Sequence, residues 1–233
     1  WVAGSPWNRW PDAHGMGGQM TVESAAIAPF VETMRKIEAE EAPYVPPLFD
    51  PETMSDEPAF LVEWLRAETA FQLVGQTCVS MLSETLKIFF MTHEDLSGFD
   101  MKACGKGAFK NGFIQGYQAG FAHYGVDWSQ CPVDFDILEQ VVLARNSTQH
   151  GNHITSTRIS HKRDDLKKHS SPVFVSAHEK EMMEQWGGSW LIEPAIHVTR
   201  DALHQAVGEV EKLAEWMSTI DFRALLRAHR TAP

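Results

Sequence analysis

Cysteine is scarce in this sequence, and the few cysteines present are not clustered. Cys78, Cys104 and Cys131 are the only three in 233 residues, and no C-x-x-C pair occurs. Small exported domains are usually cross-linked by disulfides between an even number of cysteines, and structural zinc sites need clustered cysteines. The cysteine content therefore favours a reducing, cytoplasmic location and argues against a disulfide framework or a zinc ribbon.

Long apolar runs are missing as well. Charged residues or glycines interrupt every apolar stretch before it reaches the roughly 18 residues typical of a membrane span. Residues 1–18 mix glycine and proline with tryptophan and lack the basic, apolar and small-residue order of a signal peptide. We therefore expect a soluble protein that is neither exported nor bound to a membrane.

Positive charge is in short supply. Lysine and arginine number 20 against 31 acidic residues, which gives a formal net charge of −11 at pH 7. A mean field of this sign repels a polyanion, so any role in nucleic-acid binding requires a local basic surface.

Apolar residues recur every three or four positions in most of the chain, a pattern typical of amphipathic helices. The spacing predicts long helices at about 55–92, 106–124, 132–150 and 196–217, an earlier helix at 21–41 and a short one at 221–230. Prolines between 43 and 51 predict an extended linker, because proline lacks a donor and restricts its neighbour. Two segments rich in β-branched and aromatic residues, 173–175 and 190–192, predict two short strands that could pair as a hairpin.

The expected organisation is an all-α chain. Residues 1–54 form an N-terminal arm, a helix and a proline-rich linker, and residues 55–233 form the helical domain. A polar insertion at about 152–194, comprising a basic loop and the hairpin, precedes the last long helix.

The run Arg145-Asn146-Ser147-Thr148-Gln149-His150 closes the helix predicted at 132–150, and Gly151 follows as a helix stop. Its residue types suit RNA cleavage without a metal. Attack of a ribose 2′-hydroxyl on the adjacent phosphate needs proton transfer, which His150 can perform near neutral pH, and stabilisation of a crowded, highly charged phosphorane. Arg145 can bind two phosphate oxygens at once, and Asn146 can hold the 2′-hydroxyl or orient the imidazole.

The spacing of the run sets a geometric condition on this chemistry. Residues five apart on a regular helix, such as Arg145 and His150, point about 140° away from one another. Either the helix unwinds before His150, or two copies of the run meet across a symmetric interface and form one composite site.

An R-N-x3-H run that closes an apolar helix and precedes another long amphipathic helix resembles the R-x4-6-H signature of HEPN-superfamily ribonucleases. The resemblance covers about residues 55–217. It implies an up-and-down four-helix bundle, a homodimer, and metal-independent RNA cleavage that leaves a cyclic phosphate. It assigns catalysis to Arg145, Asn146 and His150, with no cofactor, in a toxin or antiviral defence effector that is held in check by an antitoxin or another regulatory partner. The acidic net charge and the long insertion depart from the simpler members of that superfamily.

The insertion offers a local basic surface close to the run. Arg158, Lys162, Arg163, Lys167 and Lys168 stand there against Asp164 and Asp165. We expect these cations to guide RNA phosphates to the site; the alternative is a solvated loop that binds nothing.

Other functions compete with this interpretation. Several histidines between His150 and His178 allow a metal hydrolase, but their spacing fixes no coordination geometry, so no metal is expected. Ser147 and Thr148 next to His150 do not form a recognisable nucleophile motif. The main alternative is a non-catalytic helical module that binds a nucleotide or protein, in which Arg145 forms a structural ion pair.

Overall fold

The computed structural model describes residues 22–47, 57–101, 103, 105, 107–149, 159–169, 171–185 and 193–231. The chain divides into two compact units, Trp1–Val74 and Gly75–Pro233, and each is described by itself. The division falls inside the long helix α2 (Leu61–Ser97). The domain boundary expected between residues 54 and 55 lies outside the described residues and stays a prediction.

The first unit pairs helix α1 (Val22–Glu38) with the beginning of α2. Met34 of α1 is buried together with Ala67 and Phe71 of α2. The indole nitrogen of Trp64 donates a hydrogen bond of 2.9 Å to the Glu38 carboxylate, which ties the end of α1 to the same stretch of α2. The helix predicted at 21–41 is confirmed, although it ends at Glu38.

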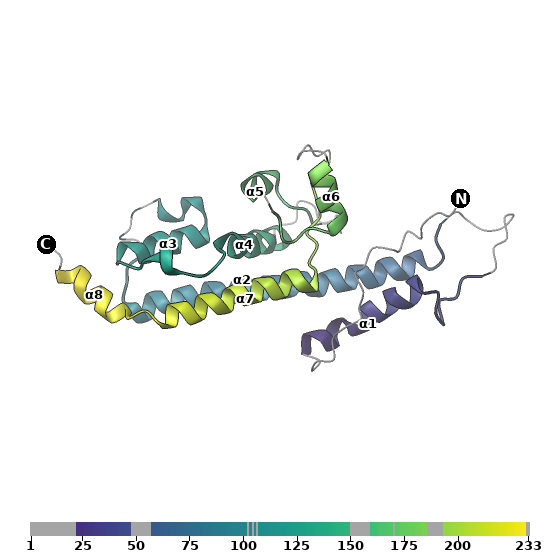
Figure 1. The fold of residues 1–233 in the computed structure, drawn as a ribbon, viewed down its shortest axis with the longest axis horizontal. Coiled ribbons are helices and arrows are strands. Elements are labelled where there is room, and N and C mark those ends of the chain that lie inside the picture. The colour runs from purple at the N-terminus through teal and green to yellow at the C-terminus, as the bar shows by residue number, and fades with distance from the viewer. Residues whose placement is uncertain are drawn as a thin grey trace. The chain divides into compact units, whose positions relative to one another are not determined.

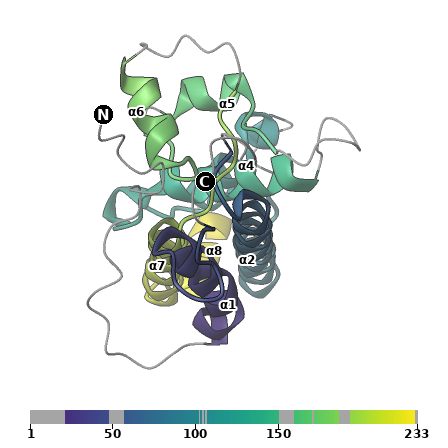
Figure 2. The same cartoon turned by 90° about the vertical axis from the view of Figure 1, so that its right-hand side faces the viewer.

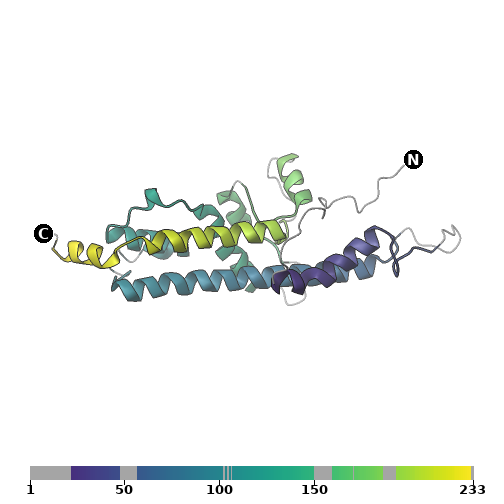
Figure 3. The ribbon, with the colours of Figure 1, turned by 60° about the horizontal axis from the view of Figure 1, so that its bottom comes forward.

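The second unit, which begins at Gly75 within α2, is mostly helical in its described residues (Figure 1). Figures 1 and 2 show α3 to α6 on one side of the pair formed by α2 and α7, and Figure 3 shows α2 and α7 side by side. After α2, its elements are η1 (Ala108–Asn111), α3 (Phe113–His123), η2 (Trp128–Gln130), α4 (Phe135–Gln149), α5 (Arg163–Lys168), α6 (Ala177–Gln185), α7 (Arg200–Ser218) and α8 (Phe222–Thr231).

Two buried clusters hold this unit together, because each helix contributes one apolar face. The larger cluster is rich in aromatic side chains, and Phe90 of α2 stacks on Tyr117 of α3 at a centroid distance of 4.9 Å. The fully buried members of the larger cluster include Leu86, Phe90, Phe121, Leu138, Leu213 and Met217, and those of the smaller cluster include Val79, Val141, Ala144, Phe174 and Ala206.

The three long helices of this unit alternate in direction. On α4, Thr148 approaches Ser80 of α2 and Arg145 approaches Glu84, so α4 runs antiparallel to α2. At the other end of α4, the backbone N–H of Asp134 donates to the buried Glu209 carboxylate of α7 over 2.8 Å. The Thr199 hydroxyl caps the start of α7 by accepting from the Ala202 N–H at 3.1 Å.

The described structure confirms an all-α chain and changes the expected insertion. Residues 173–175 were predicted as a strand, and this was wrong: they form bends, and Phe174 and Val175 are buried. The partner segment 190–192 lies outside the described residues. Instead of a basic loop, residues 163–168 form helix α5, and a further helix, α6, follows; the nearest feature to a sheet is an isolated antiparallel bridge between Ser160 and Ala195.

Two expectations from composition can be compared with the described residues. Cys131 is a free thiol, while Cys104 lies outside that part of the chain. In the same part of the chain, no helix has both the length and the apolar content to cross a bilayer.

Truncation of the core should cost far more stability than truncation of the neighbouring surface. Leu213→Ala removes a fully buried side chain from the larger cluster and should lower the free energy of unfolding by about 2–5 kcal/mol. Glu211→Ala, on the exposed side of the same helix, should change it by less than about 0.5 kcal/mol. Chemical denaturation of both variants measures this, and equal losses would contradict the packing described for α7.

Candidate functional site

The run that closes α4 lies where this helix packs on α2. Arg145 forms an ion pair with Glu84 of α2. One turn further along, the Thr148 hydroxyl donates to the Arg145 carbonyl over 2.8 Å and lies 3.3 Å from the Ser80 hydroxyl. These contacts fix the last turn of α4 against α2.

The Arg145 guanidinium is held from two sides and is partly accessible. Its Nη2 donates to Oε1 of Glu84, and its Nη1 donates to the Asn146 side-chain oxygen over 3.1 Å. The Nε atom is buried and has no hydrogen-bond partner among the described residues. The side chain is 23% exposed, so a ligand can reach part of the guanidinium. An arginine has more N–H donors than these two bonds use, so Arg145 retains donors for a further acceptor.

The structure brings together two of the three predicted catalytic residues. Arg145 and Asn146 touch, and both are partly buried. His150 lies outside the described residues, so its distance from Arg145 stays untested. Ser147 is buried and Thr148 is hydrogen-bonded to the helix backbone, so neither hydroxyl is placed as a free nucleophile.

The predicted phosphate-guiding cations lie on or beside α5, apart from Arg158, which is outside the described residues. Lys162, Arg163, Lys167 and Lys168 are exposed. Arg163 pairs with Glu193 at 2.9 Å, and Lys167 pairs with Asp164 at 3.2 Å. Part of the basic charge expected here is therefore compensated by acids, one of which, Glu193, the sequence pattern did not associate with this segment.

A second cluster of polar side chains was not predicted. Asp136 and Gln140, one turn apart on α4, bind the segment that follows α5. The Nδ1 of the buried His169 lies 2.5 Å from an Asp136 oxygen, and the Gln140 amide donates to the other oxygen over 2.7 Å. The oxygen of the same Gln140 amide accepts from the Val173 N–H at 2.7 Å.

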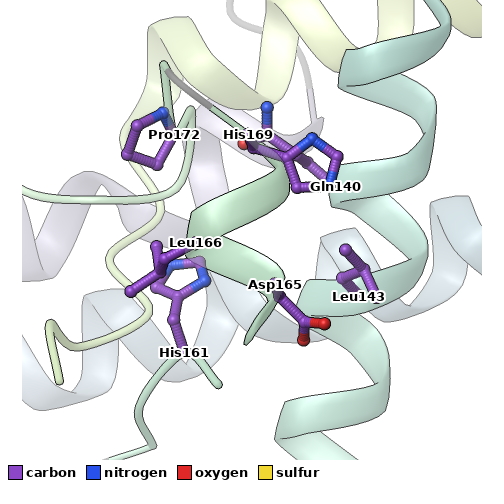
Figure 4. Close-up of a pocket in the computed structure, with 7 residues that line it drawn as sticks. All are labelled: Gln140, Leu143, His161, Asp165, Leu166, His169 and Pro172. Atoms are coloured by element: carbon purple, nitrogen blue, oxygen red, sulfur yellow. The ribbon is translucent and has the colours of Figure 1, made fainter. Parts of the chain in front are cut away.

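This cluster lines a small pocket between α4 and α5 (Figure 4). A carboxylate accepts, so the Nδ1–H of His169 donates to Asp136, which orients the ring. The Nε2 of His169 is buried and has no partner among the described residues. The residues that line the pocket are Gln140, Leu143, His161, Asp165, Leu166, His169 and Pro172.

His161 is oriented in a similar way. Its Nε2 donates to the Phe174 carbonyl over 2.7 Å, and the same carbonyl accepts from the His197 N–H over 3.1 Å. Histidines with one nitrogen fixed by a carboxylate or carbonyl are common at metal sites and acid–base sites. Within the described ranges, however, no group of three or more histidine, cysteine, aspartate or glutamate side chains is arranged to hold a metal.

Sequence spacing could not have found this cluster. Asp136 and His169 are separated by 33 positions, and nothing in the order of residues pairs them. The only signal was the density of histidines after position 150, which indicated polar chemistry without a partner. In the described structure the cluster holds the insertion against α4, which is sufficient to explain the burial of His169.

Comparisons of this chain with protein-family models, curated proteins and solved structures found no match.

Mild acid should destabilise the second unit through its partly buried histidines. Burial lowers the pKa of His161 and of His197, and it also lowers the pKa of His93. In the unfolded chain these groups titrate near about 6.5, so stability is complete above that pH and falls as the pH drops towards the lower folded pKa values. Ordinary carboxylates titrate mainly below this window.

Urea denaturation at several pH values between neutrality and mild acid measures this loss. His197→Asn should flatten the pH dependence of the unfolding free energy, because it removes one partly buried group whose pKa is lowered in the fold. His204→Asn, at an exposed position on α7, serves as the matched control and should leave the pH dependence unchanged. A wild-type protein that is equally stable across this window would contradict the assignment.

Proposed function

We propose that this protein is a metal-independent endoribonuclease of the HEPN type, with Arg145, Asn146 and His150 as its catalytic residues. The observation that carries the proposal is the environment of Arg145. Its guanidinium is fixed at the end of α4 by Glu84 and Asn146, is partly accessible, and keeps unused donors. A cation held in this way can bind developing charge without rearranging, which is the arrangement that stabilises transition states best.

The proposed reaction needs no water and no metal. The ribose 2′-oxygen forms a bond to the adjacent phosphorus, the bond from phosphorus to the 5′-oxygen breaks, and the products are a 2′,3′-cyclic phosphate and a free 5′-hydroxyl. The proton of the 2′-hydroxyl passes to a His150 imidazole, and the leaving 5′-oxygen receives its proton from a His150 imidazolium, so protons are conserved over the step. Arg145 neutralises the phosphorane oxygens, and the Asn146 amide, whose oxygen already accepts from Arg145, presents its N–H groups to the substrate.

We further propose that two copies form the composite site. An exposed apolar stripe runs along the face of α2 that also carries Glu84, and its residues follow one another at spacings of three and four. A second copy that packs on this stripe would bring two Arg145 side chains near one another. Exposed apolar stripes of this kind mark interaction surfaces. The stripe comprises Met81, Ile88 and Met91, which are 66%, 61% and 47% exposed, and Glu84 lies between Met81 and Ile88.

The biological role follows from the resemblance to HEPN ribonucleases. A cytoplasmic toxin or antiviral defence effector that cuts RNA needs an antitoxin or other regulatory partner to restrain it. The cations of the insertion, Arg158, Lys162, Arg163, Lys167 and Lys168, are assigned to the RNA substrate close to the site.

A second candidate function is favoured by the same ion pair. A non-catalytic HEPN-like module that binds a nucleotide or protein would keep Arg145 only to hold α4 on α2, and the pairing of Arg145 with Glu84 serves that purpose. The two functions differ in whether the unused donors of Arg145 act on a substrate.

An RNA cleavage assay separates the two functions. Wild-type protein should cut labelled RNA in the presence of a chelator, and Arg145→Ala and His150→Ala should each reduce the rate by about 10²–10⁴-fold. Asn146→Ala should lower it less. Product analysis should find cyclic phosphate ends.

The controls test whether a loss of cleavage is a loss of fold. Glu84→Gln keeps the size of the acid but weakens its hold on Arg145, so this variant should stay folded, retain partial activity and lose part of its thermal stability. Circular dichroism of every variant reports folding. If the folded wild type leaves RNA intact, the non-catalytic module is favoured and the enzyme is excluded.

A substitution in the α2 stripe tests the proposed dimer separately. Ile88→Glu places a charge in the middle of the α2 stripe and should convert a dimer into a monomer, as determined by light scattering during size-exclusion chromatography. Cleavage should fall in parallel, because each composite site needs both copies.

Gln205→Glu adds the same charge at an exposed position on α7 and should leave the dimer intact. A monomeric wild type with full activity would overturn the composite site while leaving the catalytic residues assigned.

A further inference from the structure

The helix α8 concentrates positive charge in a chain that is strongly acidic overall. Its ten residues contain Arg223, Arg227, His229 and Arg230 and no acid, whereas the whole chain has a net charge of −11. This contrast gives the surface of α8 a local sign opposite to that of the rest of the protein, and a polyanion responds to local charge more than to the mean.

The three arginines of α8 share one face of the helix. Spacings of four and three residues place Arg223, Arg227 and Arg230 within a narrow arc, along about 10 Å of the helix axis. All three side chains are exposed. The opposing side of α8 carries Phe222, Leu225 and Leu226, which pack against the larger buried cluster of the unit.

The charges of this arginine face are not compensated in the way that those of α5 are. On α5, Arg163 and Lys167 are paired with acids. Among the residues that the structure describes, no ion pair joins an acid to Arg223, Arg227 or Arg230. An arginine without an acid partner has its full set of donors available for phosphate, which it binds in a bidentate manner.

The packing of α8 also argues against binding of this helix to a membrane. Amphipathic basic helices that lie on bilayers insert their apolar side between the lipids. In α8 that side packs on the unit and is only partly exposed: the side chain of Leu226 lies near Gly98 and that of Leu225 near Gly125, which are the turns that end α2 and follow α3. The charged face is the more exposed of the two, so we expect the partner to be recognised by charge.

We propose that the arginine face of α8 is an anchoring site for the phosphate backbone of RNA. This inference rests on the proposed function in its choice of RNA as the polyanion. Exposed imidazole rings lie on another side of the same helix, where His229 contacts His123 at a centroid distance of 4.9 Å, and such rings can stack on unpaired bases of a strand that wraps round α8. Single-stranded RNA is therefore the form that fits best.

The position of this site separates it from the catalytic residues. Gly98, next to Leu226 of α8, directly follows α2 and stands 14 positions beyond Glu84, or about 21 Å along the axis of that helix. A long strand can contact both places, whereas a dinucleotide can reach only one. The α8 site thus anchors long RNA and leaves the chemistry of short RNA unaffected.

The test compares two variants that lose the same charge. The first carries Arg223→Gln, Arg227→Gln and Arg230→Gln; the control carries Lys180→Gln, Arg200→Gln and Lys212→Gln elsewhere on the unit. Fluorescence anisotropy measures binding of a long, single-stranded 2′-O-methyl RNA, which cannot be cleaved, as a function of salt. Circular dichroism confirms that both variants fold.

We expect the α8 variant to bind about tenfold or more weakly and to lower the salt slope by about 2, since each phosphate contact on a single strand contributes about 0.7. The control should bind as the wild type does. Equal weakening in both variants, or none in the α8 variant, overturns the proposal. Loss of binding to phosphatidylserine vesicles with RNA binding retained would overturn it in favour of a lipid surface.

Cleavage assays keep this inference distinct from the proposed function. For an active wild type, the α8 variant should raise KM for long RNA, keep kcat, and cut a dinucleotide at the wild-type rate. If the wild type binds the 2′-O-methyl RNA through α8 but cuts nothing, the enzyme is excluded and the anchoring site stands. If the wild type cuts RNA and the α8 variant binds normally, the anchoring site is excluded and the enzyme stands.

Discussion

The ion pair between Arg145 and Glu84 is the constraint on which the rest of the second unit depends. A guanidinium that is mostly withdrawn from water needs a compensating acid, because an unpaired charge in such a place is costly. Glu84 supplies that acid from a neighbouring helix, and Thr148 and Ser80 add a neutral contact one turn away. The same pairing therefore sets the register of α4 on α2 and orients the group to which we assign phosphate binding.

Helix α4 serves two neighbours with different parts of its surface. Its last turn is fixed on α2, while Asp136 and Gln140 bind the segment that follows α5. Gln140 uses both its donor and its acceptor there, and Asp136 accepts from two side chains. The polar insertion is consequently attached to α4 by directed hydrogen bonds as well as by the burial of Phe174, which explains how a stretch with few apolar residues is ordered at all.

The helices could be predicted from the sequence because each of them buries one continuous face. The 3–4 spacing located α4, α7 and α8 to within about four residues and α2 to within about six, and it placed Arg145 near the end of a helix. The strand predicted at residues 173–175 failed for a physical reason. The β-branched and aromatic content of this segment fills a gap in the core one side chain at a time, as with Phe174, and is not paired in a ladder.

Side-chain pairs between residues that are distant in the chain could not be predicted from the sequence. Glu84 stands 61 positions before Arg145, and Asp136 stands 33 before His169, so helix periodicity cannot connect them. The prediction of an uncompensated basic surface at α5 missed the acid that pairs with Arg163 for the same reason, since Glu193 comes 30 positions later in the chain. The spatial relation of His150 to Arg145 remains a prediction from the motif.

The carbonyl of Phe174 joins two stretches that are distant in the chain, because it accepts from the imidazole of His161 and from the backbone of His197. If the Phe174 carbonyl moves away, the His161 imidazole and the His197 backbone N–H both lose their hydrogen-bond acceptor. Unfolding of the insertion is therefore coupled to unfolding of the segment that precedes α7. These two segments should open as one cooperative unit.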